Sequence, residues 1–381
     1  MPKTVYYTSV GPALTLHDLD IDNAALIKRG TVTLPANIQY AWPHPSRRFL
    51  YVVSSSGGPG IAGDAHFASA LAIDPATGSL TLHGAPAALP SRPIHASVDG
   101  SGGYLLTAYN NPSNVTVHRI NADGTVGAPV TQPDKLDTGI YAHQVLAAPG
   151  NRTVILVTRG NHTEAGKPED PGALRTYRFD NGVLSNLASI APGNGLGFGP
   201  RHLDFHPTQP WAFVSIERQN KLHVYKLDDA TGLSRDPLFI RDTLADPAST
   251  SPQGAGPIHV HPNGKFVYVT NRTFPASGAG SRKVAEGGEN TVVTFAIDGK
   301  TGEPKRLQNI YGHGVQLRTF GIDPSGRMLA VASIMPLDDG SLPAGVMTYR
   351  IGDDGMLTFV RKYDVDVGSR QQFWSGMVTL G

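Results

Sequence analysis

The sequence predicts an all-β protein: a seven-bladed β-propeller of four-stranded antiparallel blades that forms one domain over residues 1–381. Three observations indicate this fold. Turn-forming residues, 44 glycines and 30 prolines, are spread along the whole chain instead of being concentrated in one linker. A strand–turn–strand unit recurs about every 55 residues, as is typical of propeller blades. The segments at the two chain ends also complement each other.

The repeated unit is a pair of apolar strands joined by a turn rich in Pro, Asp, Gly or Asn. Six copies are visible, at residues 39–56, 94–110, 142–160, 201–217, 258–272 and 318–334. Their first turn residues serve as anchors and lie 49 to 62 residues apart: Pro45, Gly100, Pro149, Pro207, Pro262 and Pro324. Two β-sandwiches are the alternative architecture for such strand density, but they give no reason for the period.

Each pair is followed by a third alternating strand, for example NVTVHRI or KLHVYKL, and then by a fourth, less regular strand. One face of these strands is apolar, which suits a sheet packed between neighbouring sheets. The C-terminal FWSGMVTLG resembles an inner strand pair cut short, and the N-terminal TVYYTSV and ALTLHDLD resemble the rest of that repeat. Joining the two ends would complete a seventh blade and remove the open edge.

Composition argues against several classes of function. The formal net charge is +1, from 32 basic and 31 acidic residues, so we expect neither a nucleic acid nor a membrane as partner. The absence of cysteine excludes disulfides, thiolate catalysis and cysteine-bound metal. The segment MPKTVYYTSV has no apolar signal-peptide core, and no run is long enough to span a bilayer. We therefore expect a cytoplasmic protein, as a monomer or small homo-oligomer.

Polar residues that share a repeat position should converge, because equivalent positions in successive blades lie at similar radius and height around one axis. The position six residues before the anchor holds His143, Arg201 and Arg318, and the next position holds His95 and His202. The position ten residues after the anchor holds Ser55, Asn110, Arg159, Glu217 and Arg272. Both positions fall at the end of the hairpin opposite its turn, so these side chains are expected at one mouth of the central channel.

This set of residue types indicates a binding site for an anion. Arginine carries a rigid, permanently charged fork that suits carboxylate or phosphate. Glu217 among arginines should be ionised with a lowered pKa, and His143 is the natural proton carrier near neutral pH. Arg201, Glu217 and Arg272 together favour a functional site, because unpaired charge in a channel needs an explanation.

Other residues have a structural explanation. Arg159 and Arg318, each considered alone, are explained at least as well by a structural role in which the side chain holds neighbouring blades together. Four histidines alternate along strands beside Pro or apolar residues, and we expect them to be structural residues with satisfied hydrogen bonds: His202, His206, His259 and His261. The sequence contains neither a Gly-x-Ser-x-Gly elbow nor a His-Glu-x-x-His motif, so serine-hydrolase and zincin mechanisms lack their usual signatures.

Several motifs resemble the lactonase family of seven-bladed propellers, which includes bacterial 6-phosphogluconolactonase and fungal carboxy-cis,cis-muconate cyclase. They are GPRHLDFHP followed by Glu217, AHQVLAAPGNRT, PIHASVDGSGGYLLTAYN, IHVHPNGKFVYVTNRT and RTFGIDPSGRMLAV, and they cover most of residues 38–334. The resemblance implies a metal-independent site without a cofactor. It implies four catalytic residues, His143, Glu217, Arg201 and Arg272. Five neighbours are then candidate substrate contacts: His95, Asn110, Arg159, Arg318 and His202.

Three connections, at residues 161–172, 273–289 and 335–345, are longer than the turns of the bacterial enzyme. Each follows the second strand of a repeat, so we expect it to crowd the same mouth and to alter specificity. The first hypothesis is a lactonase that hydrolyses an anionic sugar or sugar-acid lactone. The alternatives are a lactone-forming cycloisomerase acting on a carboxymuconate-like diacid, and a non-catalytic binding module.

The general base is left open between two residues. A histidine base, His143, predicts loss of activity below roughly pH 6. A Glu217 base held at low pKa by arginines predicts activity that persists at more acidic pH. In both cases Arg201 and Arg272 would hold the substrate and stabilise charge on its carbonyl oxygen.

Overall fold

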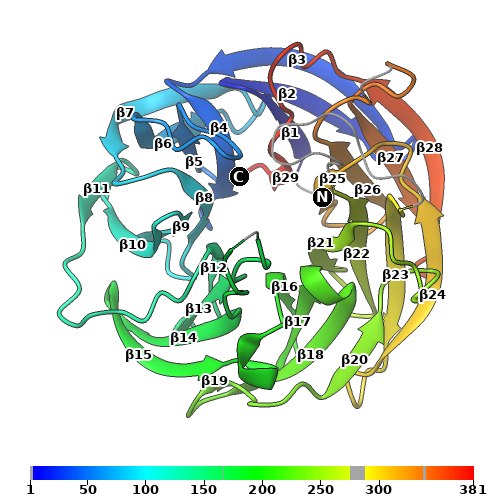
Figure 1. Ribbon diagram of the computed structural model, residues 1–381. Coiled ribbons are helices and arrows are strands. Elements are labelled where there is room, and N and C mark those ends of the chain that lie inside the picture. Colours follow the sequence, from blue (N-terminus) through cyan, green and yellow to red (C-terminus); the bar gives the residue numbers. More distant parts are fainter. Residues whose placement is uncertain (1–2, 165, 275–287, 338–339) are drawn as a thin grey trace.

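Seven antiparallel sheets form a ring around a central axis (Figure 1). The computed structural model describes residues 3–164, 166–274, 288–337 and 340–381. The seven-bladed propeller expected from the repeat is confirmed, and each sheet is one blade. The described residues include no helix that is long and apolar enough to cross a membrane.

Strands of the same rank in each blade occupy the same distance from the axis. The innermost strands are β29 (Ser375–Thr379), β4 (Asn37–Pro43), β8 (Pro93–Val98), β12 (Ala142–Ala147), β16 (Pro200–Phe205), β21 (Gln253–Val260) and β25 (Leu317–Ile322). The second strands are β1 (Thr4–Val10), β5 (Phe49–Ser55), β9 (Tyr104–Asn110), β13 (Thr153–Thr158), β17 (Trp211–Ile216), β22 (Phe266–Thr273) and β26 (Met328–Ser333).

The outer strands follow in the same order. The third strands are β2 (Ala13–Asp20), β6 (His66–Ile73), β10 (Ser113–Ile120), β14 (Ala173–Asp180), β18 (Lys221–Asp228), β23 (Thr291–Ile297) and β27 (Gly345–Ile351). The outermost strands are β3 (Ala25–Thr33), β7 (Leu80–Ala88), β11 (Val126–Pro129), β15 (Val183–Ile190), the short β19 (Gly232–Leu233) and β20 (Phe239–Asp242) of one blade, β24 (Pro304–Tyr311) and β28 (Leu357–Asp364). Two 3-10 turns are η1 (Pro192–Gly195) and η2 (Glu217–Gln219).

The two chain ends close the ring, as expected. Strand β29 pairs with β1 from Thr4 opposite Thr379 to Thr8 opposite Ser375. Beyond this ladder, the hydroxyl of Ser9 donates to the carbonyl oxygen of Trp374 at 3.0 Å and accepts from its amide at 2.9 Å. The C-terminal segment supplies the innermost strand of this blade and the N-terminal segments supply the other three, as the sequence indicated.

The core lies between blades, because a single four-stranded sheet cannot bury both of its faces. In one cluster, Phe213 of β17 and Val224 of β18 pack against Val267 and Val269 of β22 in the next blade, and all four are fully buried. Burial of this apolar area between sheets is the main stabilising contribution.

Histidines fasten neighbouring blades at the turn end of the hairpins. The Nε2 atoms of His44, His206 and His261 each lie 2.9 Å from a glycine carbonyl oxygen of the following blade. The structural role expected for His206 and His261 is therefore confirmed.

Candidate active site

A β-bulge recurs near the start of the inner strands and aims one side chain per blade. In β12, Ala142 lies opposite Thr158 and Gln144 opposite Val157, so His143 is the extra residue. The same irregularity occurs in six of the seven inner strands of the described chain. The extra residues of β4, β16 and β25 are Gln39, Arg201 and Arg318. The shared repeat position in the sequence is therefore a bulge, a device that redirects side chains beside functional sites.

Glu217 contacts three arginines from three successive blades. Its Oε1 lies 3.1 Å from Nε of Arg201 and accepts a hydrogen bond from Nη2 of Arg272. Its Oε2 accepts from Nη1 of Arg159 at 3.3 Å. The arginines come from the blades that contain β12, β16 and β21, which follow one another in the ring of Figure 1. The structure thus brings together four of the residues that the repeat alignment singled out.

Glu217 is placed by the η2 turn, which it begins directly after β17. A glycine in the next blade leaves room for it: a Cβ on Gly254 would lie 2.7 Å from Cγ of Glu217, closer than real carbon atoms approach. Gly254 is paired with Arg272 in β21 and β22. The close approach of the two blades at this point therefore depends on the missing side chain.

Burial and charge act against each other in this cluster. Burial alone would raise the pKa of Glu217, but Arg272, Arg159 and Arg201 outweigh it and lower the pKa to about 2. Arg201 is only 1% exposed. Burial, together with the positive charge of Arg272, lowers its pKa to about 9. Arg201 Nη1 and Arg272 Nε are buried without a hydrogen-bond partner among the described residues, so both are free donors.

His143 lies beside this cluster, among aromatic rings. The ring of Tyr141 stacks on it, with centroids 6.5 Å apart, and the guanidinium of Arg159 lies 3.9 Å from the centroid of Tyr141. Burial and then the charge of Arg201 lower the pKa of His143 well below its ordinary value. The imidazole is therefore neutral at neutral pH and able to accept a proton.

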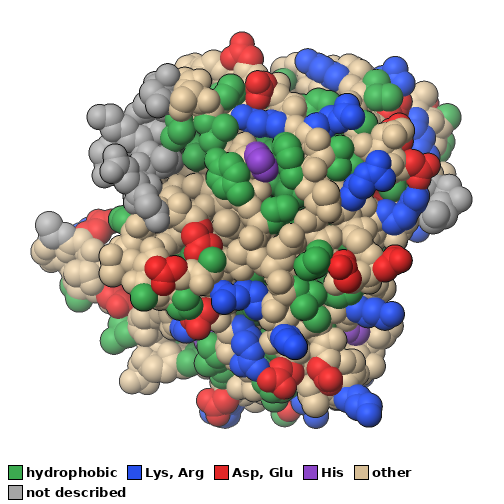
Figure 2. All heavy atoms as spheres, turned by 90° about the vertical axis from the view of Figure 1, so that its right-hand side faces the viewer, with side chains coloured by type: hydrophobic (Ala, Val, Ile, Leu, Met, Phe, Trp, Pro, Cys, Tyr) green, Lys and Arg blue, Asp and Glu red, His purple; other side chains and the backbone are tan. Residues whose placement is uncertain are grey.

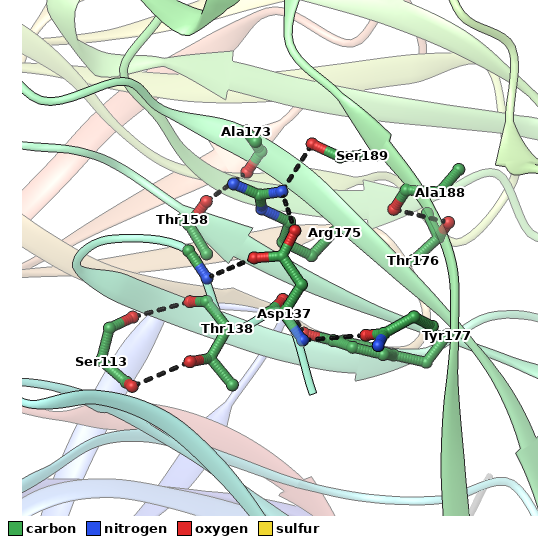
Figure 3. A network of polar contacts seen from close by, with 12 residues as sticks. Ser113, Asp137, Thr138, Thr158, Ala173, Arg175, Thr176, Tyr177, Ala188 and Ser189 are labelled. Atoms are coloured by element: carbon green, nitrogen blue, oxygen red, sulfur yellow. Dashed lines mark hydrogen bonds and ion pairs between the residues drawn. The ribbon is translucent and has the colours of Figure 1, made fainter. Parts of the chain in front are cut away.

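The backbone that leads into β12 is held by a hydrogen-bond network (Figure 3). Tyr141 has a positive φ of 59°, which non-glycine residues seldom adopt. Ser113 of the preceding blade fixes this bend: its hydroxyl donates to the carbonyl oxygen of Thr138 at 2.7 Å and accepts from the amide of Ala142 at 2.9 Å. Strain of this kind persists only where the surroundings enforce it, and here they orient His143.

The same connection is fastened on its other side. Asp137 forms an ion pair with Arg175 of β14, and its carbonyl oxygen accepts from the hydroxyl of Tyr177 at 2.7 Å. Arg175 also donates to Ser189 of β15 at 2.7 Å. The segment before His143 is therefore attached to both of the blades that it joins.

His95 and His202 continue a line of rings along the axis. Ring centroids lie 5.0 Å apart between His143 and His202, 5.9 Å between His202 and His95, and 4.0 Å between His95 and Tyr40. The imidazole of His202 has no hydrogen-bond partner among the described residues, in contrast to the expected satisfied structural role. His259 is the fourth histidine of that set, and its Nδ1 lies 3.4 Å from Oδ2 of Asp204.

The rings separate the charged mouth from a cavity at the opposite end of the axis. That cavity has a volume of about 290 Å³ and is lined by Tyr40, Trp42, His259, Phe320 and Trp374 among others.

The other expected contacts are distributed around this mouth. Arg318 lies with its guanidinium 3.6 Å from the ring centroid of Phe373. Asn110 is set apart from the cluster and lines a shallow depression with Tyr141 and Asn161. Ser55 is engaged locally, with Oγ 2.8 Å from Nδ1 of His66. Substrate contact by Asn110, His95 and His202 stays a prediction.

Three residues of this mouth were missed: Arg92, Tyr141 and Phe373. Each lies one or two positions before an inner strand, just upstream of the residues compared between repeats. Arg92 and Tyr141 both lie eight residues before their anchors, Gly100 and Pro149, so extending the comparison by two positions would have found them; Phe373 belongs to the C-terminal segment, which has no anchor.

The long connections were expected at this mouth. In the first, Glu169 forms an ion pair with Arg218, the residue after Glu217, and accepts a hydrogen bond from the amide of Gly197. In the third, Met335 lines a cavity at the mouth. Both expectations are confirmed. Of the second connection, residues 275–287 lie outside the described residues.

A family model described as "Lactonase, 7-bladed beta-propeller" matches residues 4–335. The chain belongs to this lactonase family. Proteins named 6-phosphogluconolactonase are similar to it. The one from Pectobacterium carotovorum is 31% identical over 319 residues, covering 78% of this chain and 86% of that protein. The one from Yersinia pestis is 28% identical over 375 residues, with 96% of each chain covered.

Solved structures show the same fold. A structure described as the periplasmic gluconolactonase of Pseudomonas aeruginosa has a TM-score of 0.74 at 20% identity and covers 99% of both chains. A protein from Lactobacillus plantarum has a TM-score of 0.74 at 22% identity, with full coverage of both chains. The family expected from the motifs, and with it an enzyme of the lactonase type, is confirmed. A cytoplasmic location stays a prediction.

Proposed function

We propose that this chain hydrolyses the lactone of an anionic sugar or sugar acid. The observation that carries the proposal is the charge balance of the mouth, where one buried carboxylate, Glu217, meets three arginines next to a neutral imidazole. The excess positive charge suits an anionic substrate. The names of the relatives, which are 6-phosphogluconolactonases, support the same substrate class.

In the proposed mechanism His143 is the general base. Its neutral imidazole takes a proton from a water molecule while the water oxygen attacks the lactone carbonyl carbon. The free donors on Arg201 and Arg272 bind the carbonyl oxygen as negative charge develops there. The ring C–O bond then breaks, and the proton held by His143 passes to the leaving oxygen, so that a hydroxy acid is released.

Glu217 is better suited to hold the arginines than to act as base. Both of its oxygens are engaged by arginines, Oε2 by Arg159 and Oε1 by Arg201 and Arg272, so neither is free to take a proton from water. The sequence leaves the general base open between His143 and Glu217, and we therefore propose His143.

The acid side of the pH profile is expected to separate the two bases less sharply than for an exposed histidine. Burial and Arg201 lower the pKa of His143 well below its ordinary value. For a His143 base, the loss of activity is therefore expected at a lower pH than the roughly pH 6 of an exposed imidazole, and the pH profile stays a prediction.

Replacing His143 by Gln tests the proposal. With a panel of phosphorylated and unphosphorylated sugar lactones and proton release as the signal, we expect kcat to fall by about 10²- to 10⁴-fold and KM to change little. His83→Gln, on the outer strand β7, is the matched control. Unchanged kcat in His143→Gln would remove His143 from the mechanism, and a wild-type protein that hydrolyses none of the lactones would refute the proposal.

Two outcomes would favour the alternatives. Lactone formation from a carboxymuconate-like diacid, without hydrolysis of sugar lactones, would indicate a cycloisomerase with the same arginines. Activity on neither class would favour a binding module. The face of the rim shown in Figure 2 mixes Lys and Arg with Asp and Glu side chains, between which hydrophobic side chains lie in small groups. Larger apolar patches mark typical docking surfaces.

A further inference from the structure

Two more arginines, the buried Arg92 and the half-buried Arg318, lie beside the Glu217 cluster. Arg92 is only 7% exposed, and the guanidinium of Arg318 is stacked on Phe373. Among the described residues, neither arginine lies within 4.0 Å of a carboxylate oxygen. Their positive charges therefore add to the excess positive charge that remains because Glu217 is one carboxylate among three arginines.

Both guanidinium groups lie over the same aromatic ring. That of Arg318 lies 3.6 Å from the centroid of Phe373 and that of Arg92 lies 5.7 Å from it. Each Nε is also bonded: Arg318 donates to the carbonyl oxygen of Phe373 at 3.2 Å, and Arg92 donates to Oε1 of Gln39 at 2.9 Å. Gln39 is the bulge residue of β4. The two forks are thus fixed in orientation before any ligand arrives, which lowers the entropy cost of binding.

A cavity opens next to this pair. It has a volume of about 280 Å³ and is lined by Gln39, Phe373, Arg370 and Met335 and by residues 56–58 among others; Arg92 and Arg318 lie behind Gln39 and Phe373 and are not among its lining residues. One water occupies ~30 Å³ in the liquid, so the cavity has room for a phosphate or carboxylate group together with part of a carbon chain. The cavity shares Gln39 and Phe373 with the arginine pair, and Arg318 adjoins the catalytic cluster.

The positive charge at this place is costly without a ligand. Burial lowers the pKa of Arg92. Burial, followed by the charges of Arg201, Arg272 and Arg92, lowers the pKa of Arg318 well below its ordinary value. Uncompensated buried cations destabilise a fold, and a bound anion would remove much of that cost. The arrangement has the features of a site built for an anion.

We propose that Arg92 and Arg318 form a second anion subsite, which binds a phosphate or carboxylate at the end of the substrate remote from the reacting carbonyl. The inference rests on the proposed function and extends it: Arg201 and Arg272 act at the carbonyl, while Arg92 and Arg318 select a substrate with a charged tail. Gln39 positions Arg92, and Phe373 positions both arginines.

Three lactones that share a ring and differ in the terminal group test the subsite: one with a hydroxyl, one with a carboxylate and one with a phosphate. In the wild type we expect kcat/KM to be higher for a charged tail than for the hydroxyl. In Arg92→Met we expect this preference to fall about 10- to 100-fold, because hydrogen bonds to a charged group are lost. Arg92→Lys should recover part of it, because the charge returns without the fork.

Arg119→Met is the matched control. The guanidinium of Arg119 also lies 5.7 Å from an aromatic centroid, that of Tyr104, but on the exposed outer strand β10. This control should keep the preference of the wild type. An equal preference in the wild type and Arg92→Met would overturn the subsite.

Calorimetric titration with inorganic phosphate separates failure of the subsite from failure of the proposed function. We expect phosphate to bind the wild type and Arg119→Met, and to bind Arg92→Met at least tenfold more weakly. That result supports the subsite even if no lactone is hydrolysed. Equal phosphate affinity in the wild type and Arg92→Met would overturn the subsite even if lactones are hydrolysed.

Discussion

Replacing Glu217 by Ala removes the only carboxylate of the described residues that contacts Arg159, Arg201 and Arg272. Breaking a buried ion pair from one side costs about 3–5 kcal/mol, because the remaining charges stay buried and unpaired. The lowered pKa of Glu217 gives a similar value by a separate route: a shift from about 4.3 in the unfolded chain to about 2 corresponds to about 3 kcal/mol. For a chain of this length, the unfolding entropy of about 0.8 kcal/mol per degree converts that loss into a decrease in Tm of about 4–6 °C.

The difference between wild type and variant should depend on pH in one direction. The folded-state pKa of Glu217 lies below its unfolded value, so its contribution to stability is present above about pH 4.3 and is lost as the pH falls towards 2. Denaturant unfolding of both proteins across this range measures the difference. We expect the two curves to converge as the pH approaches 2.

Formate provides a direct check on the cause, because it can occupy the space that the carboxylate leaves. We expect formate to raise the Tm of Glu217→Ala and neutral formamide to leave it unchanged. Glu169→Ala is the control: Glu169 pairs with Arg218 nearby, but its side chain is 26% exposed, and such pairs contribute about 0–1 kcal/mol. A loss below about 1 kcal/mol in Glu217→Ala, or equal effects of formate and formamide, would refute the reasoning.

Two further predictions concern the axis and the closure of the ring. Burial lowers the pKa of His95 to about 3, so its contribution to stability is present above about pH 6.5 and is lost as the pH falls towards 3. In His95→Gln, the decline of the unfolding free energy between pH 6 and 4 should therefore be shallower by about 1.4 kcal/mol per pH unit. An unchanged slope would contradict this. Ser9→Ala should cost about 1–3 kcal/mol in denaturant unfolding, because the Trp374 amide loses its partner. Ser69→Ala, whose buried hydroxyl has no partner among the described residues, should be nearly neutral; equal effects of the two substitutions would refute the closure role.

Much of the fold and of the Glu217 cluster could be predicted because the repeat carries the information. His143, Arg201 and Arg318 share a repeat position, and the structure shows why: each is the extra residue of a bulge. Positions before the inner strands were missed because the connections that precede them vary in length. Arg92 lies in such a position.

Burial and pairing could not be predicted from the sequence. Which arginines meet Glu217 depends on the η2 turn and on the close approach at Gly254. The pKa of His143 depends on its depth along the axis, which residue type and spacing do not specify. For this reason the acid limit for a histidine base is now expected at a lower pH than for an exposed imidazole, while the ionised state expected for Glu217 agrees with its lowered pKa.

The recurring bulge has an evolutionary consequence. It holds residues as different as Gln39, Ile94, His143 and Arg201, so its backbone geometry does not depend on the side chain it presents. The same backbone geometry thus presents different chemistry in different blades, from the core residue Ile94 to Arg201 of the buried Glu217 cluster. New substrate ranges can arise in such a scaffold by substitution in one blade at a time.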